Sequence, residues 1–162
     1  MATAPNAALT PREKKQQEAR DLTKQKIDYF SRDAFKQAIA QALPKHLTPD
    51  RMVRILIASM NRVEHLNECS LPSIVDCMMK LSQFGLEPDG YHAHLIPYYN
   101  NRANQYECQL VIDYKGLVAL TYRSGAVSNI HADVVCENDE FDYDRGEVKH
   151  HRPRRKGERG AM

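Results

Sequence analysis

A change of hydrophobic spacing near Gly90 restricts, more than any other feature, what this chain can fold into. Before it, apolar residues recur every three or four positions, which is typical of helices with one buried face. After it, apolar and polar residues alternate, which is typical of half-buried strands. Helices followed by strands, with one more helix between the strands, indicate an α+β domain. We therefore predict N-terminal helices packed on a small, antiparallel-rich sheet with an inserted helix.

Three core helices are expected before the strands, and capping residues and prolines mark their ends. The first begins at Ser31 and stops at Pro44, and the second runs over residues 48–63 from a Thr-Pro-Asp start. The third covers residues 71–84 and is apolar around most of its circumference, so we expect it at the centre of the domain. Gly85 follows it as a C-terminal cap.

The expected strands lie in the second part of the chain. Residues 91–98 and 105–112 are predicted to be extended and joined by an Asn-Asn turn, and a short helix follows over residues 114–124. Another strand is expected over residues 127–136, with alternate apolar side chains facing inward. Residues 141–150 are predicted to form a hairpin that turns at an Asp-Arg-Gly sequence.

Charge is distributed unevenly, although the formal net charge of the whole chain is only +2. Residues 1–30 are rich in charge and poor in apolar side chains, so we expect a charged flexible leader with a fraying helix. Residues 31–149 form the expected core domain. Residues 150–162 carry five Lys or Arg against one Glu, and we expect a basic tail that is a truncated loop. Any site for a polyanion must therefore be a local feature.

Several kinds of protein are disfavoured by motifs that the sequence lacks. No phosphate loop ending in Gly-Lys-Ser/Thr and no Gly-x-Gly-x-x-Gly turn follows a predicted strand, which disfavours a nucleotide-driven motor and a Rossmann enzyme. The longest apolar run, Ile55–Met60, is too short to span a bilayer, and the first residues do not resemble a secretory signal. We expect a soluble, cytoplasmic protein with reduced cysteines. These cysteines are Cys69, Cys77, Cys108 and Cys136.

One face of the helix expected over residues 48–63 is basic. Arg51, Arg54 and Arg62 lie within about 80° of one another on a helical projection. No acidic residue of the same helix shares this face, whereas a solvated face usually mixes both signs. The face is therefore either plain surface or a stripe that contacts an anion.

The helix expected over residues 114–124 combines several features of a phosphate site. Lys115 and Arg123 project from the same side, about 80° apart, and Gly116 leaves the backbone of the first turn open. The N-terminus of a helix also offers free amides and the positive end of the helix dipole. Tyr114 could stack on a base, although tyrosines in small domains more often pack in the core or at its rim.

Two groups of side chains resemble incomplete metal sites. His92 and His94 lie two positions apart on an expected strand, but two further zinc ligands at suitable spacing are missing. Seven acidic residues crowd residues 133–147. They allow a magnesium-dependent nuclease, a solvated hairpin, or an acidic patch that docks on a basic surface of a neighbouring subunit. No lysine accompanies them in a recognisable nuclease spacing, so we expect no metal, no cofactor and no catalytic residue.

Six segments between residues 43 and 149 closely resemble the RecT family of phage and prophage recombination proteins, in the same order and with consistent gaps. The segments are Leu43–Arg51 (LPKHLTPDR), Gln83–Pro88 (QFGLEP), His94–Tyr98 (HLIPY), Cys108–Gly116 (CQLVIDYKG), Arg123–Gly125 (RSG) and Glu137–Phe141 (ENDEF). The region that contains them covers about two thirds of the chain.

This resemblance implies a protein that binds single-stranded DNA and anneals complementary strands without ATP during homologous recombination. It also implies a Rad52-like α+β core, assembly into rings or helical filaments, and a companion 5′→3′ exonuclease that supplies the strands. Annealing breaks no covalent bond, so it needs no catalytic constellation. The candidates for DNA contacts lie in the matching segments or on the basic helix face. They are Lys115, Arg123, Gln109, Tyr114, Arg51, Arg54 and Arg62.

The chain departs from the family in its length. Family members usually continue with further strands and helices, whereas this chain ends just after its basic segment. We therefore expect the family fold to be incomplete at the C-terminus, either as a fragment of a longer protein or as a truncated prophage remnant. The alternatives to annealing are the magnesium-dependent nuclease and a remnant that only oligomerises.

Overall fold

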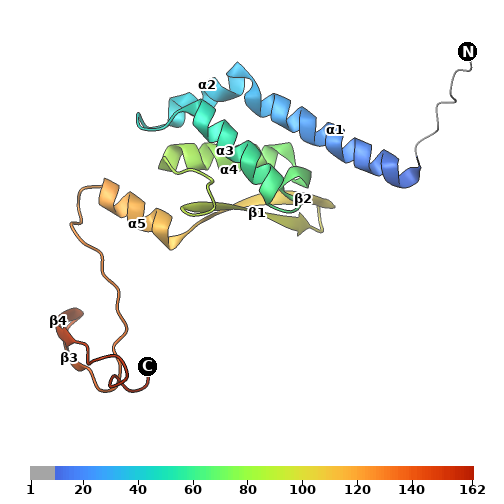
Figure 1. The fold of residues 1–162 in the computed structure, drawn as a ribbon. Coiled ribbons are helices and arrows are strands. Elements are labelled where there is room, and N and C mark those ends of the chain that lie inside the picture. Colours follow the sequence, from blue (N-terminus) through green and yellow to red (C-terminus); the bar gives the residue numbers. More distant parts are fainter. Residues whose placement is uncertain (1–9) are drawn as a thin grey trace, which may run out of the picture. The chain divides into compact units, whose positions relative to one another are not determined.

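The chain divides into two compact units, one that ends at Ala126 and one that covers Val127–Met162 (Figure 1). The computed structural model describes residues 10–162. The boundary between the two units lies after Ala126. The predicted domain boundaries lie at residues 30 and 149, and they stay a prediction. None of the helices in the described residues is long and apolar enough to cross a membrane.

Four helices and one short 3₁₀ helix precede the strands, close to the positions that the sequence predicts. They are α1 (Pro11–Ser31), α2 (Asp33–Ala42), α3 (Pro49–Arg62), the 3₁₀ helix η1 (Leu66–Glu68) and α4 (Leu71–Phe84). Pro49 occupies the first turn of α3, and Gly85 ends α4 in the left-handed conformation with a φ of 63°. Both positions follow from the ordinary preferences of proline and glycine at helix ends.

The last turns of α1 are packed against the rest of the first unit, unlike the end of a flexible leader. Phe30 is fully buried. Lys26 donates hydrogen bonds to the carbonyl oxygens of Asn67 and Cys69, at 2.6 and 2.7 Å. The many charged residues before them predict a solvated helix, but Lys26 and Phe30 attach its last turns to the rest of the unit. Ser31, the predicted N-cap of the next helix, belongs to α1, and Arg32 takes the N-cap position of α2 in its place.

The two strands of the first unit form an antiparallel hairpin, β1 (Ala93–Asn100) and β2 (Gln105–Ile112). Leu95 pairs with Leu110, and both side chains join the core on the face that meets the helices. The edge of β2 is tied to α4, because the Cys108 amide donates to the Ser73 hydroxyl at 2.9 Å. The predicted strand–turn–strand is therefore confirmed.

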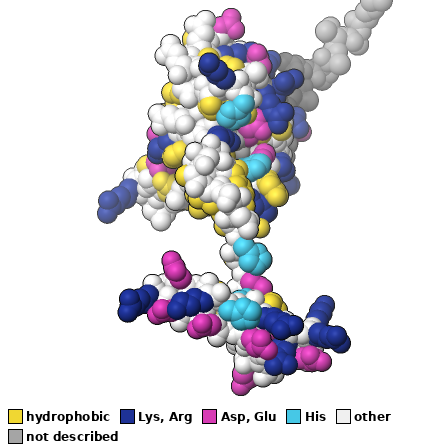
Figure 2. Space-filling model, turned by 90° about the vertical axis from the view of Figure 1, so that its left-hand side faces the viewer, with side chains coloured by type: hydrophobic (Ala, Val, Ile, Leu, Met, Phe, Trp, Pro, Cys, Tyr) yellow, Lys and Arg dark blue, Asp and Glu magenta, His cyan; other side chains and the backbone are white. Residues whose placement is uncertain are grey.

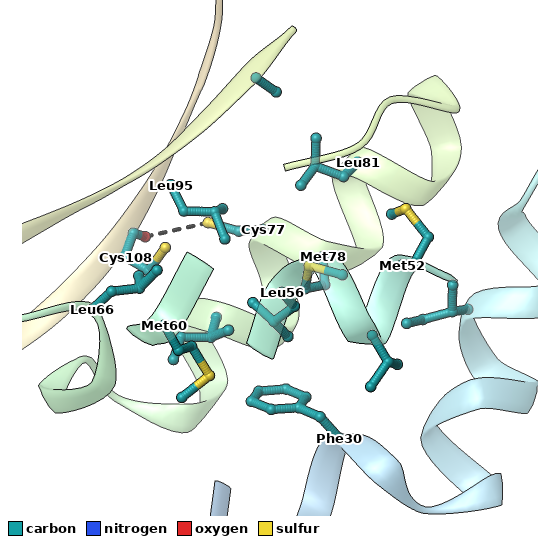
Figure 3. Packing of buried hydrophobic residues seen from close by; sticks show 14 of the residues in the cluster. Phe30, Met52, Leu56, Met60, Leu66, Cys77, Met78, Leu81, Leu95 and Cys108 are labelled. Carbon is teal, nitrogen blue, oxygen red and sulfur yellow. Dashed lines mark hydrogen bonds between the residues drawn. The ribbon is translucent and has the colours of Figure 1, made fainter. Parts of the chain in front are cut away.

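The core lies between the helices and one face of this hairpin, with α4 at its centre (Figure 3). α4 packs against β2 on one side and against α2 on the other. Its apolar circumference therefore has a partner on each side, as the sequence predicts. The buried side chains come from α1 to α4, η1 and both strands. They include Phe30, Ile39, Met52, Leu56, Leu66, Ile74, Met78, Leu81, Leu95 and Cys108.

α5 (Tyr114–Arg123) follows β2 directly and is packed against the start of the hairpin through Gly116. A Cβ atom at Gly116 would lie 2.3 Å from the carbonyl oxygen of His92 and 2.9 Å from Cγ2 of Ile112. No side chain fits in this space. Close packing against backbone therefore explains this glycine, in place of the open backbone for a ligand that we predicted.

The second unit contains one hairpin, β3 (Glu140–Asp144) and β4 (Glu147–Arg152), which confirms the predicted turn. The prediction of a strand over residues 127–136 is wrong, since this segment of the described chain has no regular secondary structure. A strand needs a neighbouring backbone to pair with. Within Val127–Met162, β3 and β4 pair with each other and not with this segment. Val134, expected to face inward, is half exposed.

A buried carboxylate organises this second unit. The side chain of Asp139 is fully buried and accepts hydrogen bonds from the amides of Cys136 at 3.0 Å and Arg154 at 2.9 Å. Nη2 of Arg159 donates to the same carboxylate at 2.7 Å. These hydrogen bonds, those from Arg159 above all, hold the pKa of the Asp139 carboxyl far below its usual range. An ion pair thus takes the place of an extended apolar core.

Replacement of Gly116 by Ala is expected to destabilise the first unit by about 1–3 kcal/mol, because the new Cβ would overlap the His92 carbonyl. Alanine normally stabilises a helix interior relative to glycine, by about 1 kcal/mol. The two effects have opposite signs. Urea unfolding of Gly116→Ala against the wild type therefore tests the packing directly, and a more stable variant would contradict it.

Acid is expected to disorder the second unit. The pKa of Asp139 is lower in the folded unit than in an unfolded chain, where it is about 3.9. Its stabilising effect is therefore complete above about pH 3.9 and is lost as the pH falls through the folded pKa. The amide proton shifts of Cys136 and Arg154, followed by NMR, should stay constant down to about pH 3.9 and change together below it. Changes centred on pH 3.9 or higher would show that the carboxylate is not held in this way.

Candidate nucleic-acid interface

The segment that leads from α4 into β1 is held at its start by Arg123 of α5. Nη1 of Arg123 donates to the carbonyl oxygens of Phe84 at 3.1 Å and Gly85 at 2.9 Å. The last carbonyls of a helix have no partner inside the helix and lie at the negative end of its dipole, so a cation there is stabilising. A Cβ atom at Gly85 would lie 2.8 Å from this Nη1, so the glycine allows the arginine to approach.

Two arginines of α3 contact the same segment further along. Arg51 forms a two-pronged ion pair with Glu87, in which Nε donates to Oε1 and Nη2 donates to Oε2. This pair raises the pKa of Arg51. Nη2 of Arg62 donates to the carbonyl oxygen of Asp89 at 3.1 Å. The basic face of α3 is therefore opposed by groups from another element, which a helical projection cannot show.

Arg54 is the exception on this helix face. It is exposed and forms no hydrogen bond or ion pair with any other described residue. Its charge acts at a distance on Asp50, whose pKa is lowered first by its contact with Lys36 and further by Arg54. All the donors of the Arg54 guanidinium therefore stay available to a ligand.

Lys115 lies where the segment ends, beside two exposed tyrosines. Its Nζ is 4.1 Å from the ring centroid of Tyr91 and 5.4 Å from that of Tyr114. The side chain of Asp113 caps α5 by accepting from the Lys115 amide at 3.1 Å, and this hydrogen bond lowers the pKa of Asp113. Tyr91 is 54% and Tyr114 68% exposed, so one cation and two aromatic faces are open to solvent together.

These groups form one surface along residues 84–91, called here the loop surface. It consists of Arg51, Arg62, Tyr91, Tyr114, Lys115 and Arg123. Arg54 is counted with it only because it shares the helix face of Arg51 and Arg62. Figure 2 looks onto the α5 end of the unit and shows Lys and Arg side chains among apolar, acidic and histidine ones. Tyr91 was not among the predicted site residues, because its contact with Lys115 joins residues 24 positions apart. In the sequence only its place beside Gly90 marks it.

Gln109 lies apart from the loop surface. It is exposed on β2 opposite Ile96, in an open groove of about 760 Å³ between β2 and α4. Asp76 and Lys80 of α4 line the same groove, and no residue of the loop surface does. The structure therefore places five of the seven candidate DNA contacts on or beside residues 84–91. Arg54 of α3 forms no hydrogen bond or ion pair with this segment, and Gln109 lies in the groove between β2 and α4.

The two histidines of β1 and its approach contact different carboxylates. Nδ1 of His92 lies 2.7 Å from Asp89 Oδ2, whereas Nε2 of His94 lies 3.4 Å from Asp113 Oδ2. Within residues 10–162, no three His, Cys, Asp or Glu side chains are close enough to hold a metal ion together.

Three of the seven acidic residues over positions 133–147 are paired with a Lys or Arg side chain. Asp139 is occupied by Arg159, and Asp144 accepts from Lys149 at 2.8 Å. Glu140 lies 3.7 Å from Arg154. A magnesium site needs several free carboxylate oxygens on one ion, and these contacts give no such arrangement.

Comparison with known proteins identifies relatives of this chain. The model of the RecT family matches residues 50–161. Protein RecT of Escherichia coli (strain K12) is 37% identical over 133 residues, which cover 78% of this chain and 49% of that protein. The chain thus spans about half the length of this curated relative. No solved structure matches, so the Rad52-like core stays a prediction.

Replacement of Arg123 by Ala is expected to lower the free energy of unfolding by about 1 kcal/mol, because two carbonyls at the end of α4 lose a charged donor that is partly exposed to solvent. Arg54→Ala is the matched control. It removes an arginine without such contacts and is expected to change stability by less than about 0.5 kcal/mol. Equal unfolding midpoints in urea for the two variants would show that Arg123 does not hold this segment.

Proposed function

Because the chain belongs to the RecT family, we propose that it binds single-stranded DNA and anneals complementary strands without ATP, in phage-type homologous recombination. The single observation that carries this proposal is the family match over residues 50–161, which contain the whole loop surface. The resemblance described above implies strand annealing for this family. The surface supplies what such binding requires.

The proposed mode of binding uses the phosphates and leaves the bases free. An annealing protein must hold the DNA backbone while the base edges stay open to a second strand. Within the described part of the chain no carboxylate neutralises Lys115 or Arg54 by contact, so these two side chains are the proposed phosphate ligands. The exposed ring of Tyr114 provides a stacking face that is independent of base sequence. Gln109 is a proposed contact on the separate face of β2.

The other three arginines have a proposed double role. Arg51, Arg62 and Arg123 already donate to the segment between α4 and β1. A guanidinium has five N–H donors, and these contacts use only one or two of them. The arginines are therefore proposed to hold the segment in place and to offer their remaining donors to phosphate.

The proposal includes the setting in which the chain acts. Rings or helical filaments of several copies, a companion 5′→3′ exonuclease and the cytoplasm of a bacterial host all follow from the family resemblance. Annealing joins strands through base pairs and breaks no covalent bond, so the proposal requires neither a cofactor nor a catalytic residue. The nuclease alternative is not favoured, because the family match supports an annealing protein and Arg159 and Lys149 occupy two of the acidic side chains.

Lys115→Gln and Arg54→Gln are each expected to weaken binding of a labelled single-stranded oligonucleotide whatever its sequence. Each change should reduce the slope of log affinity against log salt concentration by about 0.7, the value for one phosphate contact on a single strand. Arg102→Gln, in the exposed turn between β1 and β2, is the charge-matched control and should leave the slope unchanged.

Annealing is measured with two complementary oligonucleotides, without ATP, on the same proteins. Wild-type protein should accelerate duplex formation, and the two variants should do so less. Oligonucleotide fragments that appear only with magnesium would contradict the proposal and support the nuclease.

A further inference from the structure

The second unit carries a basic loop that the proposed function has not used. Arg152 ends β4, and the chain then turns through Arg154, Arg155 and Lys156. The turn is closed by a hydrogen bond from the Glu158 amide to the carbonyl oxygen of Arg155 at 2.9 Å. We propose that this loop, residues 152–156, is a second binding site for the phosphates of a DNA strand. The inference rests on the proposed function and adds a site to it.

The loop has a defined shape because it is tied to the buried carboxylate at its middle and at its end. The Arg154 amide donates to Oδ1 of Asp139 at 2.9 Å, and Arg159 contacts Oδ2 at 2.7 Å. The side-chain amide of Asn138 donates to the carbonyl oxygen of Glu158 at 3.0 Å. These ties fix the backbone, so the outward side chains start from set positions.

The same carboxylate separates the basic residues into two groups. Arg159 points inward, is neutralised by Asp139 and also donates to the Val134 carbonyl. Arg152, Arg155 and Lys156 are exposed, and none of them forms an ion pair with a described residue. Arg159 therefore stabilises the loop, and Arg152, Arg155 and Lys156 remain available to a ligand.

The outward arginines surround a polar hollow of about 320 Å³. Its lining residues are Glu140, Arg152, Pro153, Arg154, Arg155 and Glu158. Three guanidinium groups face two carboxylates, and Arg154 lies 3.7 Å from Glu140. The hollow thus has a surplus of one positive charge, and Arg152 and Arg155 form no ion pair with a described residue. A planar guanidinium binds phosphate oxygens in pairs, which suits the phosphodiester groups of a strand.

A DNA backbone is the favoured ligand over free phosphate. The hollow is open, and its two glutamates would repel a small dianion that enters it alone. A strand instead presents singly charged phosphates in series and gains from releasing counterions at each contact. Each unit of the chain then carries its own phosphate contacts.

The test compares two double variants that each remove two positive charges from the same hairpin unit. Arg152→Gln with Arg155→Gln changes the loop, whereas Arg145→Gln with Lys149→Gln changes the turn and middle of the hairpin. Neither pair touches the contacts of Asp139. Thermal unfolding of both variants should match the wild type, which shows that the unit is intact.

Binding of a labelled single-stranded oligonucleotide is measured by fluorescence anisotropy over a range of salt concentrations. The loop variant should bind on the order of tenfold more weakly at moderate salt, and its slope should be smaller by about 1.4, the value for two contacts. The hairpin variant should keep the wild-type slope. Equal slopes for the two variants would overturn the inference.

Two further outcomes separate this inference from neighbouring ideas. Wild-type protein that does not bind the oligonucleotide at all refutes the proposed function, whereas a wild type that anneals normally beside an unchanged loop variant refutes only the second site. Replacement of chloride by inorganic phosphate at equal ionic strength should preserve the difference between wild type and loop variant. Loss of that difference would assign the loop to free phosphate and overturn the assignment to DNA.

Discussion

The way the chain leaves α4 is the constraint on which the rest of the first unit depends. Gly85 must adopt a left-handed conformation there, and Arg123 satisfies the carbonyls that the helix leaves open. Further along, the buried hydroxyl of Ser59 donates to the carbonyl of Pro88 at 2.8 Å. On the exposed side, Arg51 holds the same segment through its ion pair with Glu87. This bend brings the hairpin back over α4, and the core and the loop surface both result from it.

Contacts within the chain sort the basic residues into those that build the protein and those that can bind a ligand. In the first unit Arg123 holds the end of α4. Arg54 forms no hydrogen bond or ion pair with a described residue, and the Lys115 ammonium lies beside two aromatic rings. In the second unit Arg159 neutralises the buried Asp139. A count of charges treats all of these side chains alike, which explains why a net charge of +2 says so little about a polyanion site.

Secondary structure was predictable wherever local rules decide it. The apolar circumference of α4, its terminal glycine and the alternation in β2 each have a cause within a few residues. Residues 127–136 have the same alternation and no strand, because alternation shows which side chains share a face but supplies no partner backbone. The end of α1 was misjudged for the related reason that Phe30 gains its burial from residues far away in the chain.

The sequence by itself determined the class of fold, the positions of most helices and strands, and the family. The spacing of apolar residues determines the first two, and short matching segments determine the family. Only the tertiary structure decided which arginines are free, that Tyr91 and Lys115 share a site, and that Gln109 does not. It also decided that Gly116 serves packing. The physical reason is that contact between distant residues depends on where the chain turns, and periodicity within one element carries no information about its neighbour.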